Sequence, residues 1–214
     1  MCEIRLYSKN GELLQFDKFS PVKKGTRSDI YRSIDDNKTG LRIYHAEGPM
    51  IKTIREDHFN AIKEFKHEAL PALDEVYYKT NNITPFDPVM AYTFESIEKR
   101  VLDLSDEDIL YEKIVRRIIS ASNALAENGF SLSNPLPGDV VNGANGAYLI
   151  DPNKIIKEHK LPLEELKRIN QIMALKYIKF SIINNYSQAS KSKTVVSNIP
   201  TLEKTLEKAN KMSA

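Results

Sequence analysis

The chain has 214 residues, of which 41% are hydrophobic and 28% are charged, a composition that suits a globular protein with a sizeable core. Its 31 basic and 29 acidic residues are interspersed, so the net charge of +2 gives no strong attraction to nucleic acid or to a membrane surface. The single cysteine, Cys2, excludes an intramolecular disulfide and indicates a reducing compartment such as the cytoplasm, and no apolar run is long enough to span a membrane.

The first half of the chain is predicted to be rich in strands. Apolar residues lie on both sides of Asn10-Gly11, a dipeptide typical of a type I′ hairpin. A second hairpin is predicted from residues 29–34 and 41–44, which flank a turn-forming cluster. A helix is predicted over 54–69, before Pro71, and residues 88–94 have the pattern of a buried strand that leads into a connector.

The second half is predicted to be helical. A capping-box pattern at 105–108 begins a helix over about 107–128, which stops at Gly129. A strand at 148–150 is followed by a long helix over about 163–184, and then by a mobile linker at 187–193 and a polar helix at 202–211. The sequence therefore predicts an α+β protein, with a strand-rich lobe at 1–94, a reduced helical lobe at 95–186 and a tail at 187–214.

Two features suggest a phosphate site. Gly25 lies between two predicted strands, and Arg42 lies on the strand that follows. Glycine lets backbone N–H groups approach phosphate oxygens closely, although an ordinary turn between strands also explains Gly25. In the second half, Asp139 and Asp151 flank a predicted strand pair, and carboxylate oxygens together with phosphate oxygens suit Mg²⁺. Ordinary loop residues are the alternative interpretation of these two aspartates.

The order of these elements and residues resembles the minimal protein kinases that bacteria inject into host cells, the type III effectors of the OspG kind. The resemblance covers roughly residues 15–185 and implies a two-lobed kinase-like fold, with an antiparallel sheet in the N-lobe and a reduced helical C-lobe. It implies ATP and Mg²⁺ as cofactors and a protein as partner or substrate. It also implies secretion into the host cytosol as a virulence effector.

The resemblance implies a set of nucleotide-binding residues in the first half. Arg42 stands where the family has the Lys that contacts the α- and β-phosphates, and Glu68 is its candidate ion-pair partner, with Glu64 behind it. A surface ion pair of Arg42 and Glu68 that contributes little is the alternative. The other expected nucleotide contacts are Gly25, Thr26 and Ser28 from the loop and Met90, Ala91 and Tyr92 from the buried strand.

The resemblance also implies a catalytic loop with altered residues. Asn134 stands where the family has its catalytic Asp, Asp139 stands where it has a metal-binding Asn, and Asp151 matches the Asp that holds Mg²⁺. Asn134 cannot act as a base at neutral pH, so the carboxylate that orients the acceptor hydroxyl is lost. Asp139 is the candidate to take over that role.

Three hypotheses follow. The favoured one is a pseudokinase or atypical phosphotransferase with an ATP/Mg²⁺ site, which acts by binding a protein partner, because three catalytic positions are substituted. The first alternative is an active Ser/Thr protein kinase effector, since positioning and charge neutralisation supply most of the acceleration of phosphoryl transfer. The second alternative is an unrelated α+β protein-interaction domain without nucleotide.

Overall fold

The computed structural model describes residues 5–25, 28–45, 54–84, 87–102, 111–158 and 160–191. The chain divides into two compact units, of which the first comprises residues 1–64 and 71–96 and the second comprises residues 65–70 and 97–214. The expected capping box at 105–108 and the expected helix at 202–211 lie outside the described residues. The fold class is α+β, as predicted.

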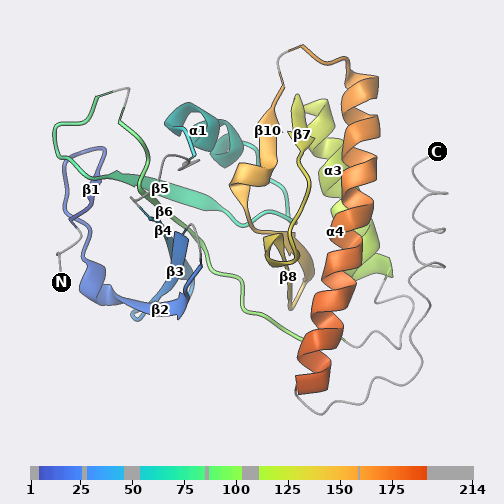
Figure 1. Cartoon of the computed structure of the whole chain (residues 1–214), viewed down its shortest axis with the longest axis horizontal. Coiled ribbons are helices and arrows are strands. Elements are labelled where there is room, and N and C mark those ends of the chain that lie inside the picture. The colour runs from blue at the N-terminus through green and yellow to red at the C-terminus, as the bar shows by residue number, and fades with distance from the viewer. Residues whose placement is uncertain are drawn as a thin grey trace. The chain divides into compact units, whose positions relative to one another are not determined.

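The first unit is built on a six-stranded antiparallel sheet with the order β1-β5-β6-β4-β3-β2 (Figure 1). Its strands are β1 (Tyr7–Ser8), β2 (Phe19–Lys23), β3 (Ser28–Ser33), β4 (Thr39–Tyr44), β5 (Leu73–Tyr78) and β6 (Ala91–Glu95). Between β4 and β5 the chain forms helix α1 (Glu56–Glu64), and a short 3₁₀ turn, η1 (Phe16–Lys18), precedes β2.

Alternating side chains give the two faces of this sheet different partners. On one face Tyr92 contacts Phe59 of α1, with 5.6 Å between ring centroids, and the Tyr78 hydroxyl donates to Glu56 of α1 at 2.6 Å. The other face is covered by Leu14, Phe16 and neighbouring apolar residues of the N-terminal segment. It holds the buried cluster of Leu6, Leu41, Ile43, Tyr77, Met90 and Ala91. The sheet therefore has a helix-covered face and a face covered by the N-terminal segment.

The second unit is mainly helical. A π-helical turn, η2 (Tyr111–Arg116), continues into α3 (Arg117–Glu127), and α3 packs against the long helix α4 (Leu163–Lys191), which runs beside it in Figure 1. Two small antiparallel ladders complete the unit. They pair β7 (Phe130–Leu132) with β10 (Ile155–Lys157), and β8 (Val140–Gly143) with β9 (Gly146–Leu149).

Buried amides tie α4 to the rest of the second unit. Asn170 is fully buried, accepts the Leu132 N–H at 2.7 Å and donates to the carbonyl oxygens of Ser122 and Phe130, both at 2.9 Å. Asn185 accepts the Leu102 N–H and donates to the Leu102 carbonyl oxygen. These bonds satisfy polar backbone groups that water does not reach, so they fix the position of α4 within its unit.

Several predicted boundaries are wrong. The helix predicted over 54–69 ends at Glu64, because the chain turns at 67–70, where the Ala69 N–H donates to His67 Nδ1 at 3.1 Å. The predicted linker at 187–193 is helical as far as Lys191, because Ser, Gln, Ala and Lys carry no helix-breaking feature. The expected hairpin at Asn10-Gly11 is reduced to β1 and a single bridge between Tyr7 and Leu13, although Gly11 has the positive φ that the turn requires.

Candidate functional site

The glycine turn predicted to contact phosphate lies between β2 and β3. The Gly25 N–H donates to Asp29 Oδ1 at 3.2 Å, and a Cβ on Gly25 would lie 2.6 Å from the Ser28 carbonyl oxygen. Glycine is therefore required by a close backbone approach. Ser28 begins β3 opposite Tyr44, and Thr26 lies outside the described residues. The anion that the Gly25 N–H contacts here is the chain's own Asp29.

Arg42 lies on the face of the sheet that α1 covers. Its Cα partners are Ile30 on β3 and Tyr92 on β6, and its Nη1 donates to the Tyr92 hydroxyl at 3.1 Å. The Tyr92 ring in turn contacts Phe59 of α1. A basic residue on β4, the second strand after the glycine turn, therefore lies on the sheet face that α1 covers.

Glu68, the expected partner of Arg42, has a different partner. It follows the end of α1 at Glu64 and belongs to the second unit, where its Oε2 lies 3.1 Å from Nη1 of Arg117. Arg117 is buried, donates from Nε to the Ala147 carbonyl oxygen at 3.0 Å and lies over the Tyr148 ring. Glu68 therefore partners a structural arginine. Glu64, the second choice, is exposed at the end of α1.

Met90, Ala91 and Tyr92, the other expected nucleotide contacts, are buried in the first unit. The Met90 N–H donates to the Tyr77 carbonyl oxygen, and the Met90 carbonyl oxygen accepts from Tyr44, both at 2.8 Å. Ala91 and Tyr92 pair with both neighbouring strands. Their backbone groups are therefore hydrogen-bonded within the sheet. The strand predicted to end at residue 94 ends at Glu95. The connector therefore begins one residue later than predicted.

In the second unit, the loop between β7 and β8 brings Asp139 beside the end of β9. Asp139 ends the 3₁₀ turn η3 (Pro137–Asp139), and its backbone carbonyl oxygen accepts the Ile150 N–H at 2.9 Å. Asp151 follows directly and caps a second 3₁₀ turn, η4 (Pro152–Lys154), through a bond from the Asn153 N–H to its Oδ1 at 3.1 Å. The β8–β9 hairpin thus holds the two predicted metal ligands close together in the chain's fold.

The Asp139 carboxylate is almost completely buried. Burial raises its pKa, the charge of Asp151 acts in the same direction, and a bond from the Leu136 N–H at 2.6 Å and the charge of Lys154 oppose the rise. The Nζ of Lys154 lies 3.5 Å from Asp139 Oδ2. A buried carboxylate in such a setting needs a cation beside it to remain ionised.

Two lysines converge on the predicted catalytic loop. The Lys154 Nζ donates to the Asn134 carbonyl oxygen at 3.1 Å, and the Lys176 Nζ donates to Asn134 Oδ1 at 2.8 Å. From α4, Asn184 Nδ2 also donates to the Pro137 carbonyl oxygen at 2.6 Å. The loop is therefore held from both sides, and the oxygen of the Asn134 amide accepts from an ammonium group.

Tyr177, next to Lys176 on α4, carries a hydroxyl group in an unusual position. Only 1% of the residue is exposed, and the hydroxyl has no hydrogen-bond partner among the described residues. Burial raises its pKa, and the charges of Asp139 and Asp151 raise it further. Buried hydroxyls normally have a hydrogen-bond partner, so the Tyr177 hydroxyl is unusual among the described residues.

Sequence reasoning missed the lysines and the tyrosine of this site. Lys154 carries a local signal, since it lies three residues after Asp151 in a Pro-containing turn. Lys176 and Tyr177 carry none, because their place beside the loop depends on how α4 packs. Within the predicted helix over 163–184, Tyr177 has the spacing of an ordinary core residue.

The donor set does not fit Mg²⁺ while Lys154 keeps its place. Mg²⁺ requires near-octahedral oxygen coordination and is held by one or two carboxylates plus phosphate. Asp139 and Asp151 supply two carboxylates, but the Asp139 carboxylate already pairs with an ammonium group.

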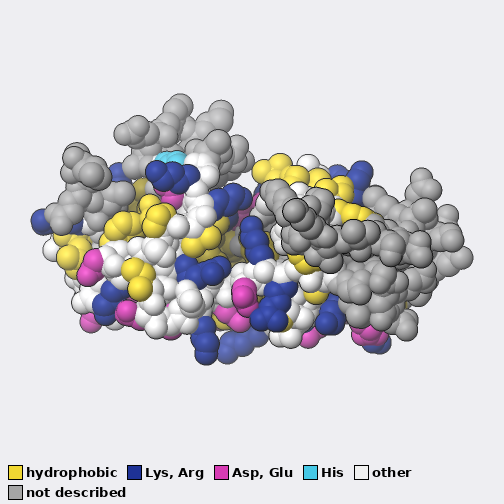
Figure 2. All heavy atoms as spheres, turned by 90° about the horizontal axis from the view of Figure 1, so that it is seen from below, with side chains coloured by type: hydrophobic (Ala, Val, Ile, Leu, Met, Phe, Trp, Pro, Cys, Tyr) yellow, Lys and Arg dark blue, Asp and Glu magenta, His cyan; other side chains and the backbone are white. Residues whose placement is uncertain are grey.

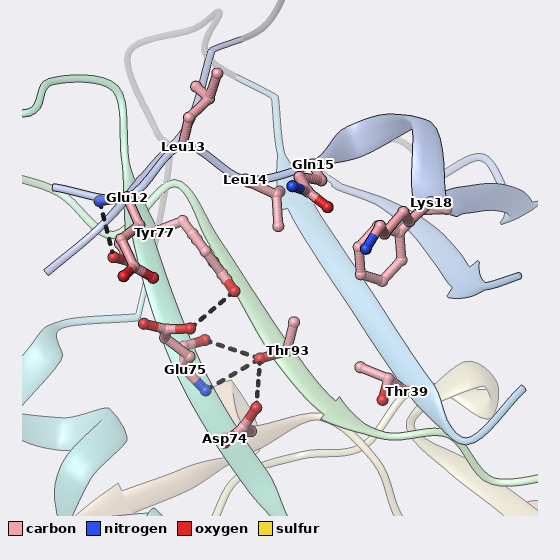
Figure 3. Close-up of a pocket in the computed structure, with 12 residues that line it drawn as sticks. Glu12, Leu13, Leu14, Gln15, Lys18, Thr39, Asp74, Glu75, Tyr77 and Thr93 are labelled. Atoms are coloured by element: carbon pink, nitrogen blue, oxygen red, sulfur yellow. Dashed lines mark hydrogen bonds between the residues drawn. The ribbon is translucent and has the colours of Figure 1, made fainter. Parts of the chain in front are cut away.

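A cavity of about 280 Å³ lies elsewhere in the first unit, on the sheet face opposite α1. Figure 3 shows the Tyr77 hydroxyl pointing to Glu75, with a bond of 3.0 Å, and Thr93 between Asp74 and Glu75. Glu12, Leu13 and Lys18 line the cavity from the N-terminal segment. None of the residues predicted to bind nucleotide lines this cavity, so it is separate from the predicted site.

The charged side chains of the described residues show both signs. On the face seen in Figure 2, Lys and Arg side chains lie among acidic, uncharged and hydrophobic ones. No helix in the described part of the chain is both long and apolar enough to cross a membrane. The absence of a nucleic-acid partner stays a prediction.

Comparisons with known proteins give no family. The chain matches no protein-family model, and a search of curated proteins returns no match.

Proposed function

We propose that this chain is a protein-kinase-like pseudokinase that binds ATP and acts through a protein partner. An atypical phosphotransferase activity is the closest variant of this proposal. Secretion into a host cytosol belongs to the proposal as well and rests on the resemblance to type III effectors alone. Mg²⁺ is left out of the proposal because Lys154 pairs with one of its expected ligands.

The first unit supports the proposal through the order of its elements. Protein kinases cover the nucleotide phosphates with a glycine-rich loop, place a phosphate-binding Lys on the third strand and follow it with a helix. Here Gly25 lies between β2 and β3, Arg42 lies on β4, and α1 follows. Arg42 lies on the α1-covered face, as the function of a phosphate-binding residue near that helix requires.

The second unit supports it through the spacing of its loop. Kinase catalytic loops have four residues between the catalytic Asp and the metal-binding Asn. Asn134 and Asp139 have the same spacing, and Asp151 follows the next hairpin, in the place of the family's second metal ligand. The pairing of Ile150 with Asp139 brings these segments together.

The observation that carries the pseudokinase interpretation is the state of Asn134. The residue is exposed, its amide oxygen accepts from Lys176, and an amide cannot take a proton from an acceptor hydroxyl at neutral pH. The catalytic loop is therefore well held but lacks its base, which suits a binding function better than rapid phosphoryl transfer.

ATP binding and phosphate transfer together test the proposal. A ligand bound by the native state alone raises its thermal stability, so ATP should raise the melting temperature of the protein. Arg42→Met should reduce this shift, while the control Arg55→Met, which removes an exposed arginine of the same unit, should leave it unchanged. The native chain should transfer no γ-phosphate to itself or to generic protein acceptors.

The other hypotheses predict different results. Robust transfer by the native chain would favour the active Ser/Thr kinase. No ATP shift in native protein would favour the interaction domain without nucleotide, an alternative that the bond between Gly25 and Asp29 already supports, because the chain's own carboxylate takes up the loop N–H.

A further inference from the structure

We infer that Lys154 takes the place of a metal ion beside Asp139, so that its ammonium group neutralises the bound nucleotide phosphates and ATP binds without Mg²⁺. This inference rests on the proposed nucleotide-binding function. It goes beyond that function because it assigns a phosphate-binding role to a residue that the kinase resemblance leaves unassigned.

The position of Lys154 is built into the fold of the second unit. Asp151 caps the turn η4 by accepting the Asn153 N–H, and the Lys154 N–H donates to the Asp151 carbonyl oxygen at 3.0 Å. The Lys154 carbonyl oxygen accepts the Ser133 N–H at 2.8 Å, which fixes the turn against the loop. The backbone of Lys154 is therefore anchored at both its N–H and its carbonyl group, so its side chain starts from a defined position.

The ammonium group completes a pair that burial requires. The side chain of Asp139 is 9% exposed and that of Lys154 is 22% exposed, and their charged atoms lie 3.5 Å apart. An ionised carboxylate in such a place is costly unless an opposite charge lies beside it. Where a kinase has an Asn that binds a divalent cation, this chain has a carboxylate paired with its own lysine.

The ammonium group also has a hydrogen-bond donor to spare. A lysine ammonium has three N–H donors, and the described residues take up two of them, through the Asp139 carboxylate and the Asn134 carbonyl oxygen. The third is available for a phosphate oxygen. Lysine binds phosphate well as a compact point charge, as the P-loop lysine does.

The ammonium group and Mg²⁺ compete for one position. Two cations at the same carboxylate edge repel each other, and Lys176 places a second ammonium group on Asn134 of the same loop. A divalent ion therefore binds less favourably here than in a site with two unpaired carboxylates.

ATP titrations by isothermal calorimetry, in EDTA and in Mg²⁺, test the inference on the full chain. Native protein should bind ATP with dissociation constants that agree within about twofold in the two conditions. Lys154→Met should weaken binding in EDTA by about tenfold or more, and Mg²⁺ should restore most of it, because the Asp139 carboxylate, no longer paired with Lys154, can then bind the ion. The control Lys167→Met removes a partly exposed lysine of α4 and should behave like the native protein.

Each result separates this inference from the proposed function. Native binding that requires Mg²⁺ would overturn the inference and leave the proposed function standing, and so would a Lys154→Met protein that binds as well as the native one in EDTA. No ATP binding in either condition would overturn both.

A second variant covers the case in which Lys154→Met fails to fold with an unpaired Asp139. The double substitution Lys154→Met with Asp139→Asn leaves no unpaired buried charge. It should lose ATP binding in EDTA, and Mg²⁺ should restore part of it, because an Asn at this position is the metal-binding residue of the kinase family. Native-like binding by this double variant in EDTA would contradict the inference.

Discussion

The backbone N–H of Gly25 donates to the carboxylate of Asp29 across the turn between β2 and β3. The turn that the sequence assigns to nucleotide phosphates is thus closed by an acidic side chain of the same chain. Asp29 also lies 3.1 Å from Nε2 of His45, at the end of the β3–β4 pair. An anion at this position repels phosphate and competes for the N–H that phosphate would use, which makes Asp29 a testable determinant of ATP affinity.

Asp29→Asn should strengthen ATP binding. The substitution keeps an acceptor for the Gly25 N–H but removes one negative charge, whose repulsion of a phosphate about 4 Å away is worth roughly 1 kcal/mol in water-like surroundings. Affinity should therefore rise about fivefold at low salt, and the gain should shrink as salt is added. Calorimetric titration with ATP measures it, with Asp57→Asn on α1 as the exposed control. Unchanged affinity would remove the turn from the nucleotide site.

Gly146→Ala should destabilise the second unit. Gly146 has a φ of +123°, and a Cβ there would lie 2.1 Å from the Lys113 carbonyl oxygen, so the β8–β9 hairpin or the π-helical turn would have to move. Overpacking and a disallowed φ together cost about 2–4 kcal/mol. Gly11→Ala is the matched control, because Gly11 also has a positive φ but nothing lies within 4 Å of its Cβ position, and it should cost only about 1 kcal/mol.

Denaturant unfolding measures both glycine variants. Because the β8–β9 hairpin joins Asp139 to Asp151, the Gly146 variant should also bind ATP less tightly than the Gly11 variant. Equal losses of stability in the two variants would show that the hairpin moves away from Lys113 at no cost.

Asn170→Ala should be strongly destabilising. The amide is fully buried and makes three hydrogen bonds, so its removal strands one backbone N–H and leaves two carbonyl oxygens with one bond fewer. Stranded buried groups cost about 1–3 kcal/mol each, and we expect a total loss of about 2–5 kcal/mol. Asn128→Ala, which removes an exposed amide with a single bond at the end of α3, should cost about 1 kcal/mol or less in the same unfolding experiment.

The fold class and the element order followed from the sequence because they depend on local patterns. The antiparallel hairpin of β3 and β4 follows from the turn-forming cluster between them, and α3 ends at Glu127, just before Gly129, whose φ is +76°. The ends of helices and strands were harder to predict where tertiary contacts determine at which residue an element ends. The chain continues the helical spacing of apolar residues past Glu64, but His67 accepts the Ala69 N–H and ends the helix earlier.

The candidate site was predictable only in part. Asp139 and Asp151 could be paired from sequence, because both flank one hairpin. The partners of Glu68 and Asp139 could not, since Arg117 and Lys154 reach them through side-chain positions set by packing. A pattern of residue types gives the kind of group at a position in the chain. It does not show which cation lies beside a given carboxylate.

The last prediction concerns the dependence of stability on pH. The pKa of Asp139 is raised in the folded protein, chiefly by burial and also by Asp151, so the folded state binds a proton more tightly than the unfolded state does. Stability therefore falls as the pH rises from the ordinary aspartate pKa through the raised one. Asp151→Asn removes one of the two causes, so it should bring the Asp139 pKa closer to its ordinary value and make stability fall less steeply with pH.

Carboxyl-carbon NMR titration of Asp139 measures the pKa, and denaturant unfolding at several pH values between 3 and 7 measures the stability. The control is Glu165→Gln at a partly exposed position of α4, and it should leave the Asp139 titration unchanged. An Asp139 pKa that does not move in Asp151→Asn would show that the two carboxylates do not interact, and the shared cation position assigned to them would have to be abandoned.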